Sequence, residues 1–175
     1  MARVTEWLRL PVVAASSEYL VMGQLMRRNI LTYKAPQNNE GYDLIAIHPD
    51  PRHKPRRGEL SQVRIQVKSR YATDCNRAFP VHERSLDAFD FLIVAFLNIG
   101  RFYHGMDGTT GGAEPEYFTL PRGFVRQHHR ISTTNTWQKV ALKGLEVEIA
   151  AFEGHQGFEM IATALGIPRP RRKLK

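Results

Sequence analysis

The chain has 175 residues and a formal net charge of +8 at pH 7, and 42% of its residues are hydrophobic. This length and composition fit one globular domain with a core of its own. The longest apolar run, residues 89–99, is interrupted by Asp90 and Asn98 and is shorter than the ~18 residues that a membrane helix needs. A single cysteine, Cys75, excludes an internal disulfide framework and a cysteine zinc site. We therefore expect a cytoplasmic protein that does not contact membranes.

The spacing of apolar residues predicts a mixture of helices and strands. In chain order, we expect a helix near residues 12–28, strands near 30–33, 43–47 and 63–69, a short helix near 83–88, a strand at 91–97, a loop at 106–114, a strand at 117–120, a helix from Pro121, a strand at 137–142, a segment of either type at 145–152, and a helix at 157–165. The uninterrupted apolar run at 91–97 indicates an interior strand that is covered on both faces. The pattern predicts an α/β fold, with residues 1–167 forming a single domain and residues 168–175 a basic, disordered tail.

Polar and apolar residues alternate strictly from Gln62 to Lys68, so Gln66 and Lys68 project together from one face of a strand. Asp43 opens a β-branched apolar run, which places its carboxylate where a second strand begins. Mg²⁺ prefers oxygen ligands, and one carboxylate with an amide oxygen supplies part of such a shell. Asp43, Gln66 and Lys68 are therefore candidates for a metal-dependent site.

Glu18 lies within the first expected helix. It shares a helix face with apolar residues at offsets of three, four and seven, namely Ala14, Ala15, Val21, Met22 and Leu25. A carboxylate buried on this face needs a cation, a proton or several hydrogen-bond donors, and a metal ion or Lys68 would serve. The alternative is structural: a helix that is held across a sheet by a salt bridge between Glu18 and Lys68.

These segments together resemble the PD-(D/E)XK nuclease superfamily, in particular its branch similar to Holliday junction resolvases. The resemblance covers residues 17–25, 41–46 and 65–69, in the order of that family. It implies a restriction-endonuclease-like mixed β-sheet flanked by helices, an endonuclease acting on DNA with Mg²⁺ or Mn²⁺, and a homodimer. It also implies that Asp43, Gln66 and Glu18 hold the metal and that Lys68 is the catalytic lysine. We further expect Ser69 and Arg70, the next two residues, to contact nucleic acid.

The sequence departs from that family at two points. Gln66 stands where the family has an acidic residue, which removes one negative charge and predicts weaker metal binding, with one tightly held ion instead of two. The literal Pro-Asp pair occurs at Pro49 and Asp50, in a proline-rich loop, whereas Asp43 has a strand behind it and is the better candidate. The neutral residue motivates an alternative function, a catalytically inactive nucleic-acid-binding or assembly module of the same fold. An RNA-directed enzyme with the same site is a third reading.

Positive charge is concentrated in two segments. Five Lys and Arg residues lie in residues 168–175, where either a phosphate-binding arm or a solubilising end fits the sequence. The connection between the two site strands contains a second group, Arg52, Lys54, Arg56 and Arg57. Prolines keep this connection extended, and we expect it to contact DNA phosphates rather than to be merely solvated surface.

Overall fold

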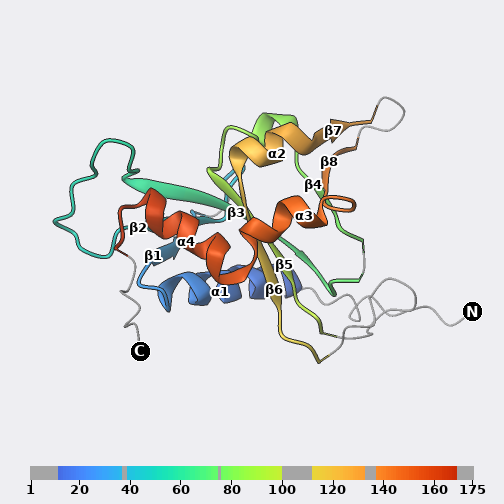
Figure 1. The fold of residues 1–175 in the computed structure, drawn as a ribbon, viewed down its shortest axis with the longest axis horizontal. Helices are drawn as coiled ribbons and strands as arrows, with labels where there is room; N and C mark the ends of the chain where they lie inside the picture. The colour runs from blue at the N-terminus through green and yellow to red at the C-terminus, as the bar shows by residue number, and fades with distance from the viewer. Residues whose placement is uncertain (1–11, 37–38, 75, 100–111, 133–136, 169–175) are drawn as a thin grey trace, which may run out of the picture.

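The computed structural model describes residues 12–36, 39–74, 76–99, 112–132 and 137–168 (Figure 1). The helices are α1 Val13–Met26, α2 Arg122–His128, α3 Glu146–Ile149 and α4 Gly154–Ala164, with short 3₁₀ turns at η2 Glu83–Ser85 and η3 Ala150–Phe152. Of the expected loop at 106–114, only the last three residues are described, and of the expected tail only Pro168. In the described part of the chain, no helix is long and apolar enough to cross a membrane.

The larger sheet has five strands in the order β1-β2-β3-β5-β6. They are β1 Leu31–Lys34, β2 Leu44–Ile47, β3 Gln62–Arg70, β5 Phe91–Phe96 and β6 Glu116–Pro121. β3 and β5 run parallel, and the other neighbours are antiparallel. All residues of β5 are buried, as the apolar run predicts. The α/β fold class is therefore confirmed as a mixed sheet flanked by helices.

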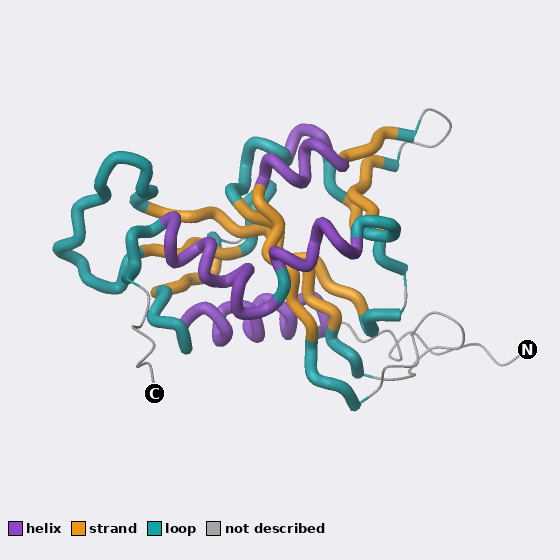
Figure 2. The backbone as a smooth tube through the Cα atoms, viewed as in Figure 1, coloured by secondary structure: helices purple, strands orange, loops and turns teal. Residues whose placement is uncertain are grey.

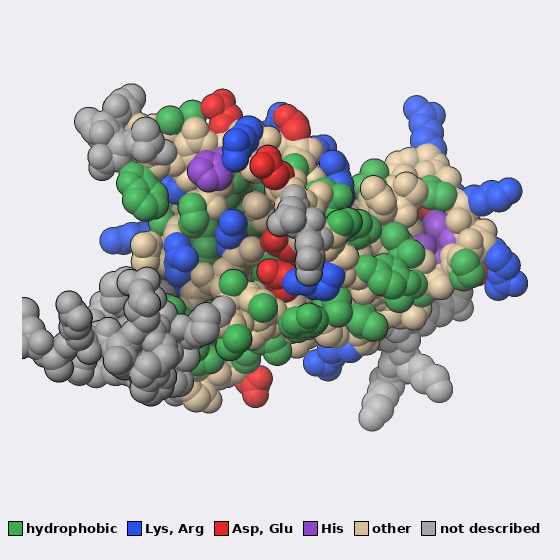
Figure 3. Space-filling view, turned by 180° about the vertical axis from the view of Figure 1, so that it is seen from behind, with side chains coloured by type: hydrophobic (Ala, Val, Ile, Leu, Met, Phe, Trp, Pro, Cys, Tyr) green, Lys and Arg blue, Asp and Glu red, His purple; other side chains and the backbone are tan. Residues whose placement is uncertain are grey.

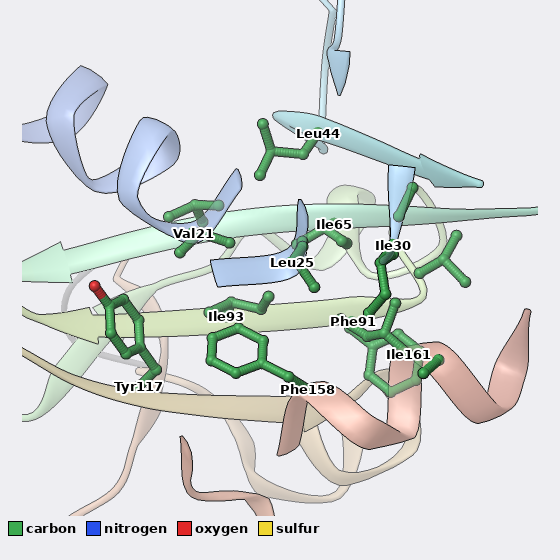
Figure 4. Close-up of a cluster of buried hydrophobic side chains, with 14 of the residues drawn as sticks. Val21, Leu25, Ile30, Leu44, Ile65, Phe91, Ile93, Tyr117, Phe158 and Ile161 are labelled. Carbon is green, nitrogen blue, oxygen red and sulfur yellow. The ribbon is translucent and has the colours of Figure 1, made fainter. Parts of the chain in front are cut away.

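Helices α1 and α4 cover one face of this sheet (Figure 4). Val21 and Leu25 lie one helical turn apart on α1 and pack with Ile65 of β3, Ile93 of β5 and Phe158 of α4. Each of these side chains is at most 1% exposed. Removing this apolar surface from water stabilises the packing of α1 against β1 and β3.

The other face is covered by a smaller sheet and by α2. The smaller sheet has the order β4-β8-β7, with β4 Ala78–Pro80, β7 His129–Ile131 and β8 Gln138–Ala141. Phe79 and Val140 from this sheet pack with Leu92, Val94 and Phe96 of β5. The sequence pattern predicts β8 but neither β4 nor β7, because a strand of three residues is too short for an alternating pattern to stand out.

The buried face of α1 differs from the expected one. Ser17, Val21 and Leu25 are the buried residues of the helix, whereas Ala14 and Ala15 are exposed. Ser17 can be buried because its hydroxyl donates a hydrogen bond to the carbonyl oxygen of Ala14 at 2.7 Å. The helix is thus rotated about its axis relative to the stripe that includes the two alanines, which moves Glu18 from the centre of the buried face to its border.

Candidate functional site

Strand β3 presents four polar side chains on the sheet face opposite α1: Arg64, Gln66, Lys68 and Arg70. The first of them is engaged by an acidic partner. Nη2 of Arg64 lies 3.1 Å from Oδ1 of Asp90, and the backbone N–H of Arg64 donates to Oδ2 of the same carboxylate at 2.9 Å. The side-chain hydrogen bonds to Asp90 raise the pKa of Arg64 above its ordinary value. Arg64 therefore has a structural partner and is not a free cation on this face.

Arg70 is engaged by backbone carbonyls. Its Nε donates to the carbonyl oxygen of Asn76 at 2.9 Å, and another of its N–H groups donates to that of Ala78. Its guanidinium carbon also lies 4.7 Å from the centre of the Phe79 ring. These contacts join the end of β3 to β4. The expected contact of Arg70 and of Ser69 with nucleic acid stays a prediction.

Gln66 and Lys68 remain on this face. Lys68 is half-buried, and no carboxylate of the described residues lies within ion-pair distance of it. Gln66 is 8% exposed, and its amide oxygen Oε1 is buried without a hydrogen-bond partner among the described residues. A buried acceptor with no partner costs about 1–3 kcal/mol. The amide oxygen of Gln66 is therefore an unsatisfied buried acceptor on this face.

Asp43 lies beside these two residues. Its Oδ2 accepts a hydrogen bond of 2.7 Å from the backbone N–H of Val67, the residue between Gln66 and Lys68. Leu44 is in register with Ile65, so Asp43 occupies the point where β2 begins and β3 continues past it. The carboxylate takes the place of a strand partner for Val67. The structure thus brings three of the four predicted site residues together at one edge of β3.

The backbone just before Asp43 depends on Gly41. Gly41 has a φ of +94°, and a Cβ at this position would lie 2.3 Å from Cβ of Ala88. Only glycine adopts such a φ without strain, and no side chain fits against Ala88. The identity of Gly41 therefore helps to set where the Asp43 carboxylate lies.

We expect Gly41→Ala to lower the free energy of unfolding by about 2 kcal/mol or more, because strain and overlap with Ala88 add. Gly58→Ala is the matched control, since Gly58 has a φ of +92° but nothing within 4 Å of the added Cβ. Urea unfolding of both variants measures the difference. Equal losses in the two would show that the contact with Ala88 contributes nothing.

Glu18 does not join this group. Its carboxylate forms an ion pair with Nζ of Lys34, and its side chain is 20% exposed. α1 packs on the face of β3 formed by the odd-numbered residues, opposite the side chains of Gln66 and Lys68. The half-buried carboxylate of Glu18 is thus paired with Lys34 rather than with Lys68, and its role as a metal ligand stays a prediction. The backbone of Lys34 nevertheless lies near that of Asp43, because Lys34 is in register with Leu44, the next residue after Asp43.

The basic connection between β2 and β3 leaves the sheet at the end opposite Asp43. It follows Ile47, whereas Asp43 precedes Leu44, so the length of β2, roughly 13 Å for four residues, separates them. Figure 2 shows this connection as a long loop that extends beyond the strands. Asp50, the aspartate of the literal Pro-Asp pair, lies in it and accepts hydrogen bonds from Arg52. Asp50 is therefore far from Gln66, which leaves Asp43 as the aspartate of the site.

The three clustered residues supply part of the ligand shell that a single hard cation needs. A carboxylate and a buried amide oxygen are oxygen donors of the kind that Mg²⁺ accepts, with water and substrate phosphate completing its shell. Among the described residues, no three His, Cys, Asp or Glu side chains gather closely enough to hold a metal ion. A metal at this site would thus depend on Gln66 as well as on Asp43, and Glu18 would need to leave Lys34 to contribute.

Comparisons with known proteins bear on the fold alone. The structure is similar to that of Hjc, a Holliday junction resolvase from the archaeal hyperthermophile Archaeoglobus fulgidus, with a TM-score of 0.46 and 8% sequence identity over 90% of this chain and 98% of that chain. No protein-family model matches the sequence. No curated protein sequence matches it.

The sequence does not indicate the ion-pair roles of two residues near the site. Lys34 is one residue beyond the expected strand at 30–33, and nothing local marks it as the partner of Glu18. Asp90 interrupts the apolar run in the sequence, yet it binds Arg64 across 26 residues of sequence. Long-range partners of this kind depend on strand order, which periodicity does not contain.

Proposed function

We propose that this protein is a metal-dependent endonuclease that hydrolyses DNA phosphodiester bonds, with Asp43 and Gln66 as metal ligands and Lys68 as the catalytic lysine. The observation that supports this function best is the buried amide oxygen of Gln66, which has no partner among the described residues and lies beside the Asp43 carboxylate. A bound Mg²⁺ or Mn²⁺ would supply Lewis-acid stabilisation of the phosphate oxygens and activation of water.

The position of Lys68 supports its proposed role. It shares a strand face with Gln66 and follows the residue to which Asp43 is hydrogen-bonded. Arg64 and Arg70, the other cations of that face, are engaged by Asp90 and by backbone carbonyls. The ammonium group of Lys68 is therefore the cation that can meet the charge developing on a phosphate and orient an attacking water.

The second candidate function is a nucleic-acid-binding or assembly module that does not cleave. It is favoured by the neutral residue at position 66 and by the pairing of Glu18 with Lys34, which together leave one carboxylate at the site. Mg²⁺ sites in enzymes use one or two carboxylates, so the charge on this site is at the low end of that range.

Cleavage of labelled DNA distinguishes the two. Duplex, branched and single-stranded substrates, with a matched RNA, are incubated with the protein and Mg²⁺ or Mn²⁺, and with EDTA as control. Metal-dependent products on any DNA substrate support the endonuclease. Binding without products on every substrate favours the module, and products from RNA alone favour an RNA-directed enzyme.

The loop between β2 and β3 is the proposed DNA contact. Its two acidic residues are used within the loop: Asp50 binds Arg52, and Glu59 accepts a hydrogen bond from the backbone N–H of Arg56 at 2.8 Å. The side chains of Lys54, Arg56 and Arg57 are exposed and have no acidic partner among the described residues. Figure 3 shows Lys and Arg side chains projecting from this end of the molecule.

Replacing Lys54, Arg56 and Arg57 together with glutamine should flatten the dependence of log affinity on log salt. Each lost phosphate contact lowers the slope on duplex DNA by about 0.9, so we expect a decrease approaching 3. Arg52→Gln should change the slope less, because Asp50 already binds that side chain. Fluorescence anisotropy between 50 and 200 mM salt measures this. An unchanged slope in the triple variant would mean that the loop is solvated surface.

A homodimer, a cytoplasmic location and the role of residues 168–175 stay predictions. The loop and the Asp43 cluster lie at opposite ends of β2, so a DNA that contacts both must span the length of that strand. This geometry suits a duplex or branched substrate better than a short single strand.

A further inference from the structure

A second polar site lies beyond the carboxyl end of β3. A cavity of about 560 Å³ opens there between the segment after β3, the start of β4 and the end of β8. Its polar lining includes Thr73, Asp74, Asn76, Arg77 and Lys143. Ligand cavities in proteins commonly have about 300–1,000 Å³, so this one has the size to admit a nucleotide.

Arg77 is the central cation of this cavity. Its side chain is 20% exposed, and its guanidinium carbon lies 5.4 Å from the ring centre of Phe96 and 5.9 Å from that of Phe118. Its Nε is buried without a hydrogen-bond partner among the described residues. A guanidinium that is held against two rings is preorganised, so its outer N–H groups can meet an acceptor in the cavity without first losing side-chain freedom.

Lys143 is held beside Arg77 by the backbone. The N–H of Leu142 donates to the carbonyl oxygen of Arg77 at 3.0 Å, and Lys143 follows at the turn that ends with Gly144. The carboxylate of Glu146 forms an ion pair of 4.0 Å with Nη1 of Arg77 and accepts a hydrogen bond from the N–H of Gly144. That bond lowers the pKa of Glu146 below its ordinary value, and Arg77 and Lys143 lower it further. Arg77 and Lys143 thus present two cations at the cavity, with the carboxylates of Glu146 and Asp74 near them.

The cavity is coupled to the proposed catalytic strand. Arg70, two residues after Lys68, donates to the carbonyl oxygens of Asn76 and Ala78, which flank Arg77 in the chain. A nucleic-acid strand that passes Lys68 along β3 would reach the cavity next. The basic loop lies at the opposite end of β2 and cannot make this contact.

We propose that this cavity binds a phosphate group of a nucleic-acid strand, with Arg77 and Lys143 as its donors. The choice of nucleic acid as the source of the phosphate rests on the proposed function. The phosphate chemistry itself rests on the two cations, on the guanidinium held against two rings and on the volume of the cavity. Asp74 also lines the cavity, so a phosphodiester with its single charge fits better than a free phosphate with nearly two.

The test compares Lys143→Gln with Lys139→Gln. Lys139 is an exposed lysine of β8 that does not line the cavity, so the two variants lose the same charge. The probe is an octathymidylate without terminal phosphates, followed by fluorescence anisotropy at several salt concentrations. For Lys143→Gln we expect binding weakened about threefold at low salt and a salt slope lower by about 0.7, the value for one contact on a single strand.

The Nε–H resonance of Arg77 provides a second readout, assigned through its loss in Arg77→Lys. Octathymidylate should shift this resonance in the wild type and in Lys139→Gln. Equal affinity and slope in the two lysine variants would overturn the proposal, as would a shift with inorganic phosphate but none with the oligonucleotide. If the protein cleaves no substrate, the endonuclease proposal fails. Weakened binding in Lys143→Gln would still support the phosphate site in that case.

Discussion

Replacing Lys68 with alanine should slow DNA cleavage by about 10²- to 10⁴-fold, the range that one charged or proton-transferring catalytic group contributes. The affinity for DNA should change little, because this lysine acts on charge that develops in the transition state. Single-turnover cleavage and anisotropy on the same substrate measure both quantities. Lys68 is half-buried at the end of a core strand, so thermal unfolding of the variant verifies that it is folded.

Lys139→Ala serves as the matched control for this variant, since it removes an exposed lysine from the smaller sheet. Its cleavage rate should equal that of the wild type. Equal activity in Lys68→Ala and the wild type would point to a contaminating nuclease or to a different catalytic cation. A loss of binding that matches the loss of cleavage would make Lys68 a phosphate contact rather than a catalytic group.

Local pattern was sufficient to predict the strands that hold the site. The alternation along β3 places Gln66 and Lys68 on one face, and the structure has them there. The start of β2 at Leu44 follows from the β-branched run after Asp43. These features depend on residues within one strand, where the period of two is enough to assign each side chain to a face.

The partners of these residues could not be predicted in the same way. Glu18 pairs with Lys34 because β1 is the edge strand under α1, and the helix is rotated so that Ser17 is buried. Both facts depend on strand order and helix packing rather than on spacing. The separation of the basic loop from Asp43 has the same origin. The loop connects the two site strands in sequence, but antiparallel pairing sends it to the far end of β2.

The smaller sheet shows a further limit of sequence patterns. Its strands β4 and β8 have only three and four residues, yet they place Arg77 and Lys143 around one cavity. In the sequence these two residues are 66 positions apart and belong to no common motif. A binding site assembled from turns in this way is found only once the tertiary structure is known.

The clearest test of the metal site is Gln66→Glu, because it can be read without activity. In EDTA, the added carboxylate is buried beside Asp43 with no cation, and we expect the free energy of unfolding to fall by about 1–3 kcal/mol. Mg²⁺ should then stabilise this variant more than the wild type. A tenfold gain in metal affinity adds about 1.4 kcal/mol of stabilisation when Mg²⁺ exceeds both dissociation constants.

Gln62→Glu is the matched control, since Gln62 is an exposed residue on the same face at the other end of β3. It adds the same charge away from Asp43 and should show the Mg²⁺ dependence of the wild type. Thermal unfolding in EDTA and in rising Mg²⁺ compares the two variants, and Asp43→Asn should remove the Mg²⁺ effect. If Mg²⁺ stabilises Gln66→Glu no more than Gln62→Glu, residue 66 is not a metal ligand. That result would favour the non-catalytic module, because Asp43 alone of the three clustered residues would be left to bind a metal.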